Sequence, residues 1–99
     1  MEISKTQSGE TCVLTLDGRL DTITAPLLQT AMEDAFTSAD HTRLDFSAVD
    51  YVSSAGLRVL LLGEKKAKAA GKTMTLRNVN AEVMEVFSIT GFSDVLTID

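Results

Sequence analysis

The sequence has too few of the residues on which several kinds of protein site depend. Its 99 residues include one cysteine and one histidine, so no internal disulfide is possible and no ligand set has the spacing of a zinc site. A single proline and six glycines argue against a fibrous or disordered chain. Cys12 lies in an alternating strand pattern, CVLTL, and we expect it to be a buried small hydrophobe.

Long apolar runs and an excess of positive charge are also missing. The longest uninterrupted apolar run, Val59 to Leu62, is far too short to span a membrane, and residues 1–5 contain no apolar signal segment. A net charge of −5 leaves no basic patch for nucleic acid. The only clustered cations are four lysines near the end of one predicted helix: Lys65, Lys66, Lys68 and Lys72. We expect these lysines to form a solvated helix face. We expect the protein to be cytoplasmic, with no nucleic-acid partner and no insertion into a membrane.

Strand and helix patterns alternate along the chain. Strands are predicted at residues 2–7, 11–16, 43–47, 72–77 and 94–98, and helices at about 24–38, 54–70 and 80–90. The turn signal Ser8-Gly9-Glu10 makes the first two strands a hairpin. We therefore predict one α/β domain over residues 1–99, with a mixed, mostly parallel sheet, an N-terminal hairpin and three helices.

Residues with defined roles mark the helix ends. Thr24 before Ala25-Pro26 is typical of an N-cap, and Asn80 is the expected N-cap of the third helix. Gly71 occupies the position favoured just after a helix. The second helix has six apolar residues between Ala55 and Leu62, so we expect its first half to be buried nearly all round.

Three loops are predicted to meet at one edge of the sheet. They comprise residues 18–21, 50–54 and 77–80, each of which follows a predicted strand. In open α/β sheets, functional sites collect at the carboxyl ends of the strands, where loops lead into helix N-termini. Ser53 and Ser54 lie at such a terminus, where free N–H groups and the helix dipole stabilise an oxygen or a phosphate. The simpler interpretation is that one of them only caps the helix.

Catalysis by this chain alone is not expected. A serine nucleophile needs a base, but the only histidine, His41, precedes the third predicted strand, at the end opposite the serines; we expect it in a surface loop. The nucleophile elbow G-x-S-x-G and the glycine-rich phosphate loops are absent, so no nucleotide or other cofactor is expected. Asp21, Asp45 and Asp50 are better explained as strand-edge or turn residues than as a metal-assisted phosphoacceptor site. The role that remains for Ser53 or Ser54, besides capping, is that of a serine modified by another protein.

The sequence DFSAVDYVSSAGLRVLL, residues 45–61, resembles the signature stretch of STAS domains, specifically the short stand-alone anti-sigma factor antagonists of bacteria. Gly18-Arg19-Leu20-Asp21 is similar to the G-x-L-D segment of that family, and Thr90-Gly91-Phe92 to its T-G-L/F segment. The likeness extends over essentially the whole chain.

The resemblance implies a partner-switching protein that is not an enzyme. Such a protein binds an anti-sigma factor that is also a serine kinase and thereby frees the sigma factor. The kinase, which holds Mg-ATP, then phosphorylates the antagonist, and a phosphatase resets it. Ser54 matches the acceptor and Asp21 the acid near it. The implied docking face comprises Asp21, Asp50, Tyr51, Val52, Ser53, Gly56, Leu57 and Arg58.

Two alternatives stay open. Ser53 stands where the best-understood family members often have aspartate, and Ala55 where they usually have Ser or Thr, so Ser53 is an alternative acceptor. The second alternative is a non-phosphorylated STAS-like structural or regulatory subunit of a larger transport or stress-signalling complex. In such a subunit the serine would serve only as a cap.

Overall fold

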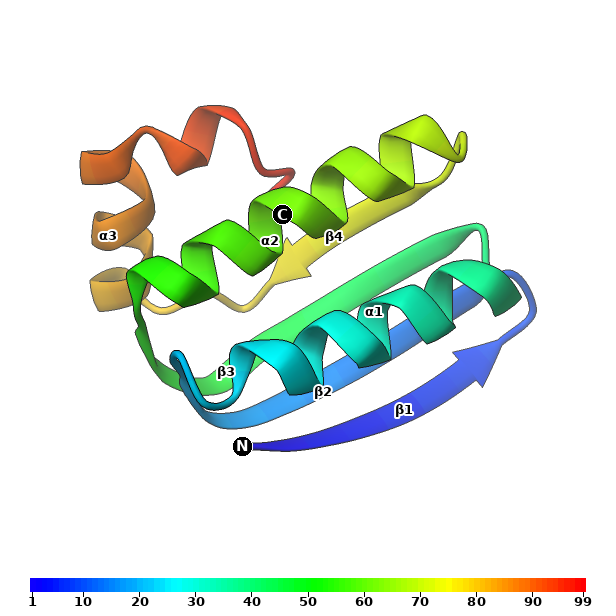
Figure 1. The fold of residues 1–99 in the computed structure, drawn as a ribbon, viewed down its shortest axis with the longest axis horizontal. Helices are drawn as coiled ribbons and strands as arrows, with labels where there is room; N and C mark the ends of the chain where they lie inside the picture. Colours follow the sequence, from blue (N-terminus) through cyan, green and yellow to red (C-terminus); the bar gives the residue numbers. More distant parts are fainter.

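The computed structural model describes residues 1–99 and shows a four-stranded sheet with three helices (Figure 1). In chain order the elements are β1 (Glu2–Ser8), β2 (Thr11–Leu20), α1 (Ala25–Ser38), β3 (His41–Val52), α2 (Ser54–Ala69), β4 (Thr73–Arg77), α3 (Ala81–Thr90) and a short 3₁₀ turn (Phe92–Asp94). The strand order is β1-β2-β3-β4; β1 is antiparallel to β2, and the other pairs are parallel. The predicted α/β fold is confirmed.

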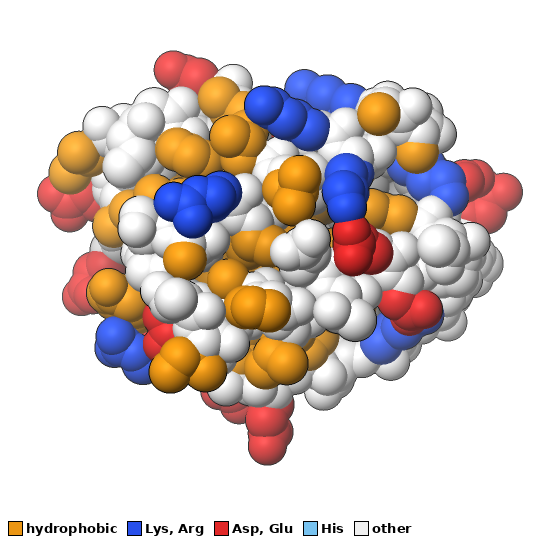
Figure 2. Space-filling model, viewed as in Figure 1, with side chains coloured by type: hydrophobic (Ala, Val, Ile, Leu, Met, Phe, Trp, Pro, Cys, Tyr) orange, Lys and Arg blue, Asp and Glu red, His pale blue; other side chains and the backbone are white.

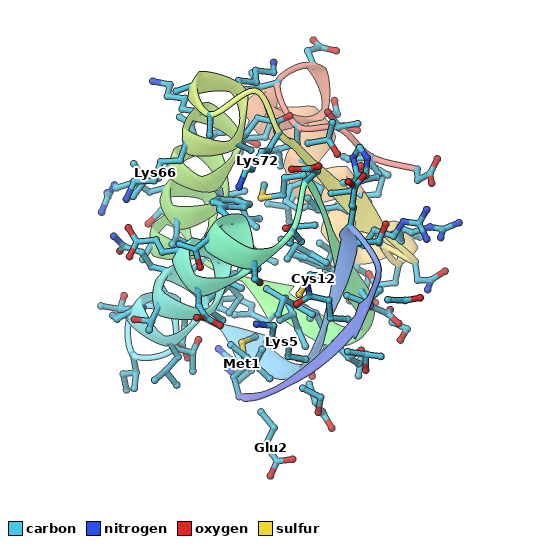
Figure 3. All side chains as sticks on the ribbon, turned by 90° about the vertical axis from the view of Figure 1, so that its right-hand side faces the viewer. Met1, Glu2, Lys5, Cys12, Lys66 and Lys72 are labelled. Atoms are coloured by element: carbon cyan, nitrogen blue, oxygen red, sulfur yellow. The ribbon has the colours of Figure 1, made fainter.

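Helices α1 and α2 lie side by side along one face of the sheet, and α3 lies beyond the end of β4 (Figure 1). Alternate residues of the strands point into the layer between sheet and helices, where 23 buried apolar residues form the core. Cys12 is fully buried there, as the alternating pattern predicts (Figure 3). Burial raises the pKa of its thiol above the ordinary value.

Strands β2 and β3 are longer than their sequence patterns predict. Residues 18–20 belong to β2 and residues 50–52 to β3, so the prediction of loops at 18–21 and 50–54 was wrong apart from Asp21 and Ser53. Two register shifts, between Thr15 and Asp17 and between Gly18 and Arg19, interrupt the pairing of these strands. Each shift breaks the two-residue alternation, which made one continuous strand look like a strand and a loop.

The predicted strand at 94–98 is also wrong. Residues 92–95 form a turn, in which the N–H of Asp94 donates to the Gly91 carbonyl and that of Val95 to the Phe92 carbonyl. Only the last residues reach β4, through a single parallel bridge between Leu76 and Ile98. Because residues 92–95 form the turn, they do not pair with β4, and no fifth strand is formed.

Helix α2 is amphipathic from its start, which corrects the expectation that its first half is buried nearly all round. Gly56, Leu57, Val59 and Leu60 are buried, whereas Ser54, Arg58 and Leu62 are exposed. These three exposed residues are spaced four apart and therefore lie along one stripe of the helix. We call them the Ser54 stripe.

The structure confirms most of the predicted helix ends. Gly71 has a φ of 72° directly after the C-cap of α2, and Gly91 caps α3 with a φ of 81°. The side chain of Asn80 accepts a hydrogen bond from the N–H of Val83 at 2.8 Å. Thr24 holds the N-cap position of α1, but its hydroxyl makes no capping bond.

Because Cys12 is fully buried and its thiol pKa is raised, we expect the native protein to resist thiol reagents. Ellman's reagent at pH 8 should label less than a tenth of the native protein during a time in which it labels all of the protein in 8 M urea. Rapid stoichiometric labelling of the native protein would show that this part of the core is open.

Candidate functional site

Ser53 is the single residue between β3 and α2, and it joins three elements. Its N–H donates to the carbonyl of Leu20, the last residue of β2, at 2.9 Å. Its hydroxyl accepts from the N–H of Gly56 at 3.3 Å, and its carbonyl accepts from the N–H of Leu57. Ser53 has extended backbone angles and is the N-cap of α2. Its hydroxyl is therefore engaged in holding the helix.

Ser54 is the first residue of α2 and is exposed. Its hydroxyl makes no hydrogen bond to the protein, in contrast with the hydroxyl of Ser53. The first turn of α2 contains no acidic residue, so no carboxylate there neutralises the positive end of the helix dipole. The two adjacent serines thus have separate environments: Ser53 is bonded into the fold, and Ser54 presents a free hydroxyl to solvent.

Gly56 brings the start of α2 against the ends of β2 and β3. A Cβ atom at this position would lie 2.8 Å from Cγ of Leu20, 2.9 Å from the Leu20 carbonyl oxygen and 3.0 Å from Cγ1 of Val52. Only glycine permits this approach without displacing the strand ends. Three residues of the expected docking face are therefore buried below the surface: Val52, Gly56 and Leu57. Arg58, by contrast, is exposed.

Asp21 organises the turn that leads into α1. Its Oδ1 accepts hydrogen bonds from the N–H groups of Ile23 at 3.0 Å and Thr24 at 3.1 Å, and from the Thr24 hydroxyl at 3.2 Å. The single proton of that hydroxyl is shared with the carbonyl of Arg19, which lies nearer, at 2.7 Å. The hydrogen bond from the Thr24 N–H is the main reason why the pKa of Asp21 lies below its usual range. Asp21, rather than Thr24, provides the side-chain acceptor at this helix start.

An arginine that sequence reasoning did not single out links Asp21 to Tyr51. The guanidinium of Arg19 stacks 4.0 Å from the centre of the Tyr51 ring, and its Nε lies 3.9 Å from Oδ2 of Asp21. Arg19 and Tyr51 are cross-strand partners in β2 and β3. Only the register after the second shift pairs them, so the sequence carried no signal for this contact. Asp50, beside Tyr51, is exposed.

The third predicted loop does not reach the serines. Strand β4 pairs only with the first half of β3, so its end lies beside Asp45 instead of Val52. Nδ2 of Asn78 donates to Oδ1 of Asp45 at 3.2 Å, and Nδ2 of Asn80 donates to the carbonyl of Val49 at 3.0 Å. The predicted meeting of residues 18–21 with residues 50–54 is therefore confirmed. The prediction that residues 77–80 join them was wrong.

The residues weighed for catalysis lie apart. His41 opens β3, instead of lying in a loop, and its ring nitrogen Nδ1 is 2.8 Å from the Thr73 hydroxyl, at the end of the strand opposite Ser53. The pKa of Asp45 is lowered mainly by the N–H of Ser47, which it binds locally. No three His, Cys, Asp or Glu side chains form a group that could hold a metal ion.

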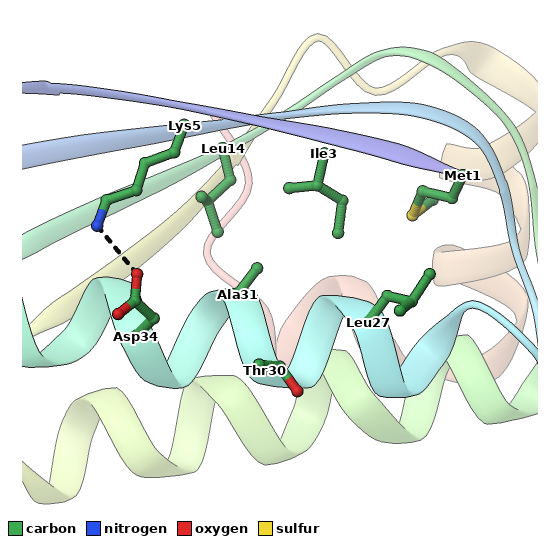
Figure 4. Close-up of a pocket in the computed structure, with 8 residues that line it drawn as sticks. All are labelled: Met1, Ile3, Lys5, Leu14, Leu27, Thr30, Ala31 and Asp34. Carbon is green, nitrogen blue, oxygen red and sulfur yellow. Dashed lines mark hydrogen bonds and ion pairs between the residues drawn. The ribbon is translucent and has the colours of Figure 1, made fainter.

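Two hollows flank α1. The larger, about 540 Å³, lies between β1 and α1 beside the ion pair of Lys5 and Asp34, and no expected site residue lines it (Figure 4). The smaller, about 250 Å³, lies between the N-terminal halves of α1 and α2, on the face where apolar side chains gather in Figure 2. We call it the α1–α2 groove; its lining is Thr22, Ala25, Pro26, Gln29, Ala55, Arg58, Val59 and Leu62.

None of the helices combines the length and hydropathy needed to cross a membrane. A family model described as "Mlab, STAS domain" matches residues 3–97, and the chain belongs to the STAS domain family. This covers nearly every residue of the sheet and helices described above, including the Ser53 junction.

Curated relatives of the chain are anti-sigma factor antagonists. The anti-sigma-B factor antagonist of Bacillus subtilis is 28% identical over 81 residues, which cover 82% of this chain and 74% of that protein. BtrV of Bordetella bronchiseptica, provisionally named an anti-sigma factor antagonist, is 40% identical over 55 residues. That match covers 56% of this chain and spans only about half, 47%, of the Bordetella protein.

Solved structures share the fold. The unphosphorylated anti-sigma factor antagonist SpoIIAA has a TM-score of 0.82 at 19% identity, covering 99% of this chain and 88% of that one. The phosphorylated form of SpoIIAA from Bacillus has a TM-score of 0.76 at 18% identity, covering 99% and 91%. One fold therefore accommodates both states of that protein.

The contacts of Asp21 predict a stability effect. Asp21→Ala removes three hydrogen bonds at the start of α1 and should lower Tm by about 4 °C or more at pH 7. The matched control is Asp50→Ala, which removes an exposed carboxylate that forms no ion pair and should leave Tm nearly unchanged.

The effect should also depend on pH. Folding lowers the pKa of Asp21 from its ordinary value of 3.8, so the ionised carboxylate stabilises the native protein at pH values above 3.8. This stabilisation is lost as the pH falls through the lower native pKa. The Tm difference between wild type and Asp21→Ala should therefore narrow below pH 3.8. A difference that stays constant from pH 7 to pH 2.5 would contradict this role of the charged form.

Proposed function

We propose that this chain is an anti-sigma factor antagonist, with residues 1–99 as its STAS domain, whose affinity for its partner is set by phosphorylation of Ser54. The observation that carries the proposal is that the two serines at the start of α2 use their hydroxyls differently. Ser53 uses its hydroxyl to cap the helix, whereas Ser54 offers a free, exposed hydroxyl one residue further on. The names of the curated relatives support the partner class.

The same geometry favours Ser54 over Ser53 as the acceptor. Phosphorylation of Ser53 would put the phosphate on the Oγ that accepts the Gly56 N–H, and so in the junction of β2, β3 and α2. Phosphorylation of Ser54 breaks no hydrogen bond of the protein. A phosphate on Ser54 adds about −1.5 to −2 charges at the positive end of the helix dipole, which the fold tolerates.

The chain itself supplies no catalytic step in this proposal. A partner kinase transfers the γ-phosphoryl group of Mg-ATP: the Ser54 Oγ–P bond forms, the bond to the β-phosphate oxygen breaks, ADP leaves and a kinase base takes the hydroxyl proton. A serine phosphatase reverses the modification by hydrolysis. The anti-sigma factor and the kinase are one protein in this scheme, so the enzyme that binds Ser54 also ends its own complex.

The proposed docking face surrounds Ser54 and includes exposed parts of both neighbouring elements. Asp50 and Tyr51 contribute from the end of β3, and Arg58 from the second turn of α2. Ser53, Gly56 and Leu57 shape this face from beneath, because they fix the start of α2. Phosphorylation places a dianion at the middle of the face, which weakens binding by repulsion and desolvation.

A second candidate is a non-phosphorylated STAS subunit of a larger transport or stress-signalling complex. It is favoured by the description of the matching family model, which names Mlab, and by the capping role of Ser53, which needs no modification. Protein taken from its native cells would then carry no phosphate and would co-purify with transporter components. Phosphate on Ser54 in the same preparation would exclude a purely structural role.

The acceptor can be identified with the partner kinase and Mg-ATP. Peptide mapping by mass spectrometry should find one phosphate per chain, on Ser54. Ser54→Ala should abolish incorporation, whereas Ser53→Ala should keep it on Ser54 while lowering Tm, because the cap is lost. Phosphate confined to Ser53 in the wild type would overturn the assignment.

Substitutions that mimic the two states should differ in partner binding. Ser54→Ala should bind the anti-sigma factor as tightly as wild type and stay bound in the presence of ATP. Ser54→Glu should bind roughly tenfold or more weakly, because its charge lies on the docking face. Calorimetric titration of both variants tests this, and equal affinities would remove the basis for a switch at Ser54.

A further inference from the structure

The Ser54 stripe places a cation one helical turn after the proposed acceptor. Ser54 and Arg58 are four residues apart on α2 and both are exposed, so their side chains are neighbours on the helix surface. Long side chains on a helix lean toward its N-terminus, which directs the Arg58 stem back over the turn that holds Ser54. An anionic residue four positions before an arginine is also the favourable order for a pair along a helix.

Arg58 is free to make such a pair. It forms none of the ion pairs of the protein, which join Lys5 to Asp34, Arg19 to Asp21, Lys66 to Glu33 and Arg77 to Asp99. The other arginine near this end of the sheet, Arg19, is held between the ring of Tyr51 and the carboxylate of Asp21. Arg58 therefore has the uncommitted guanidinium on the helix that carries Ser54.

Asp21 adds a reason for a phosphate to turn toward Arg58. Its neighbour Leu20 is bonded to Ser53, so the Asp21 carboxylate stands at the same end of the sheet as Ser54. Three hydrogen bonds fix that carboxylate in the turn before α1, and its lowered pKa keeps it ionised at neutral pH. Like charges repel, which disfavours a phosphate rotamer directed at Asp21.

Arg58 also lines the α1–α2 groove, whose other lining residues carry no charge. Among the residues that line it, Leu62 on α2 is an exposed apolar side chain. In the unphosphorylated protein Arg58 therefore supplies the one formal charge of this lining. Any event that engages its guanidinium changes the charge of the whole groove.

We propose that Arg58 reads the state of Ser54: its guanidinium pairs with the phosphate on Ser54 and is thereby withdrawn from the α1–α2 groove. This inference deepens the proposed function and rests on phosphorylation of Ser54. The pairing itself forms no covalent bond. Together with the phosphate, which carries about −1.5 to −2 charges, it changes the local charge from +1 to between about −0.5 and −1. Phosphorylation thus alters the groove as well as the hydroxyl itself.

The test installs phosphoserine at position 54 during biosynthesis, so no kinase is needed, and follows the phosphate by ³¹P NMR from pH 4 to pH 8. A nearby guanidinium stabilises the dianion, and the second phosphate pKa, ordinarily about 6, should be lower in wild type than in Arg58→Gln by about 0.3 of a pH unit or more. Arg58→Lys should fall between the two, because it keeps the charge but loses the planar fork.

The matched control is Arg43→Gln, which removes one unpaired, exposed arginine from β3 at a site lined by Asp45, Arg77 and Asn78. It should leave the phosphate pKa at the wild-type value, and the difference caused by Arg58→Gln should shrink in 1 M salt. Equal pKa values in wild type and Arg58→Gln would overturn the pairing. That failure is distinct from failure of the proposed function, which would appear as no kinase-dependent phosphate on Ser54.

Discussion

The hydrogen bond from the N–H of Ser53 to the carbonyl of Leu20 fixes the geometry on which the site depends. It ties the start of α2 to the end of β2, although the chain enters α2 from β3. Gly56 allows the helix to come within van der Waals contact of Leu20 and Val52. With the helix held there and its first turn capped by Ser53, the next residue, Ser54, must lie at the surface with its hydroxyl free.

The charged side chains around this junction differ in whether they have partners within the protein. Asp21 and Arg19 are committed to the turn before α1 and to the ring of Tyr51, so they form a fixed part of the surface. Arg58 is not committed and lies on the same stripe as Ser54. The proposed phosphate on Ser54 would thus be added near a carboxylate that is fixed by hydrogen bonds and a guanidinium that has no ion-pair partner. SpoIIAA shares the fold of this chain in both its unphosphorylated and its phosphorylated form.

The sequence predicted the fold class because its periodic segments are long and their ends carry strong signals, such as Gly71 and Asn80. It did not predict the length of β2 and β3, since two register shifts hide the continuation of both strands. Ser53 and Ser54 were located from the sequence, yet their different roles follow from the N-cap geometry, which requires the helix start to within one residue. The stacking of Arg19 on Tyr51 depends on cross-strand register and could not be predicted.

We propose that phosphorylation of Ser54, and not of Ser53, turns off a preformed docking face. The most direct test of this proposal is calorimetric titration of the anti-sigma factor with one preparation of wild-type protein, before and after stoichiometric phosphorylation and again after phosphatase treatment. The phosphate should weaken binding roughly tenfold or more, and its removal should restore binding fully. Equal affinity in all three states would contradict it.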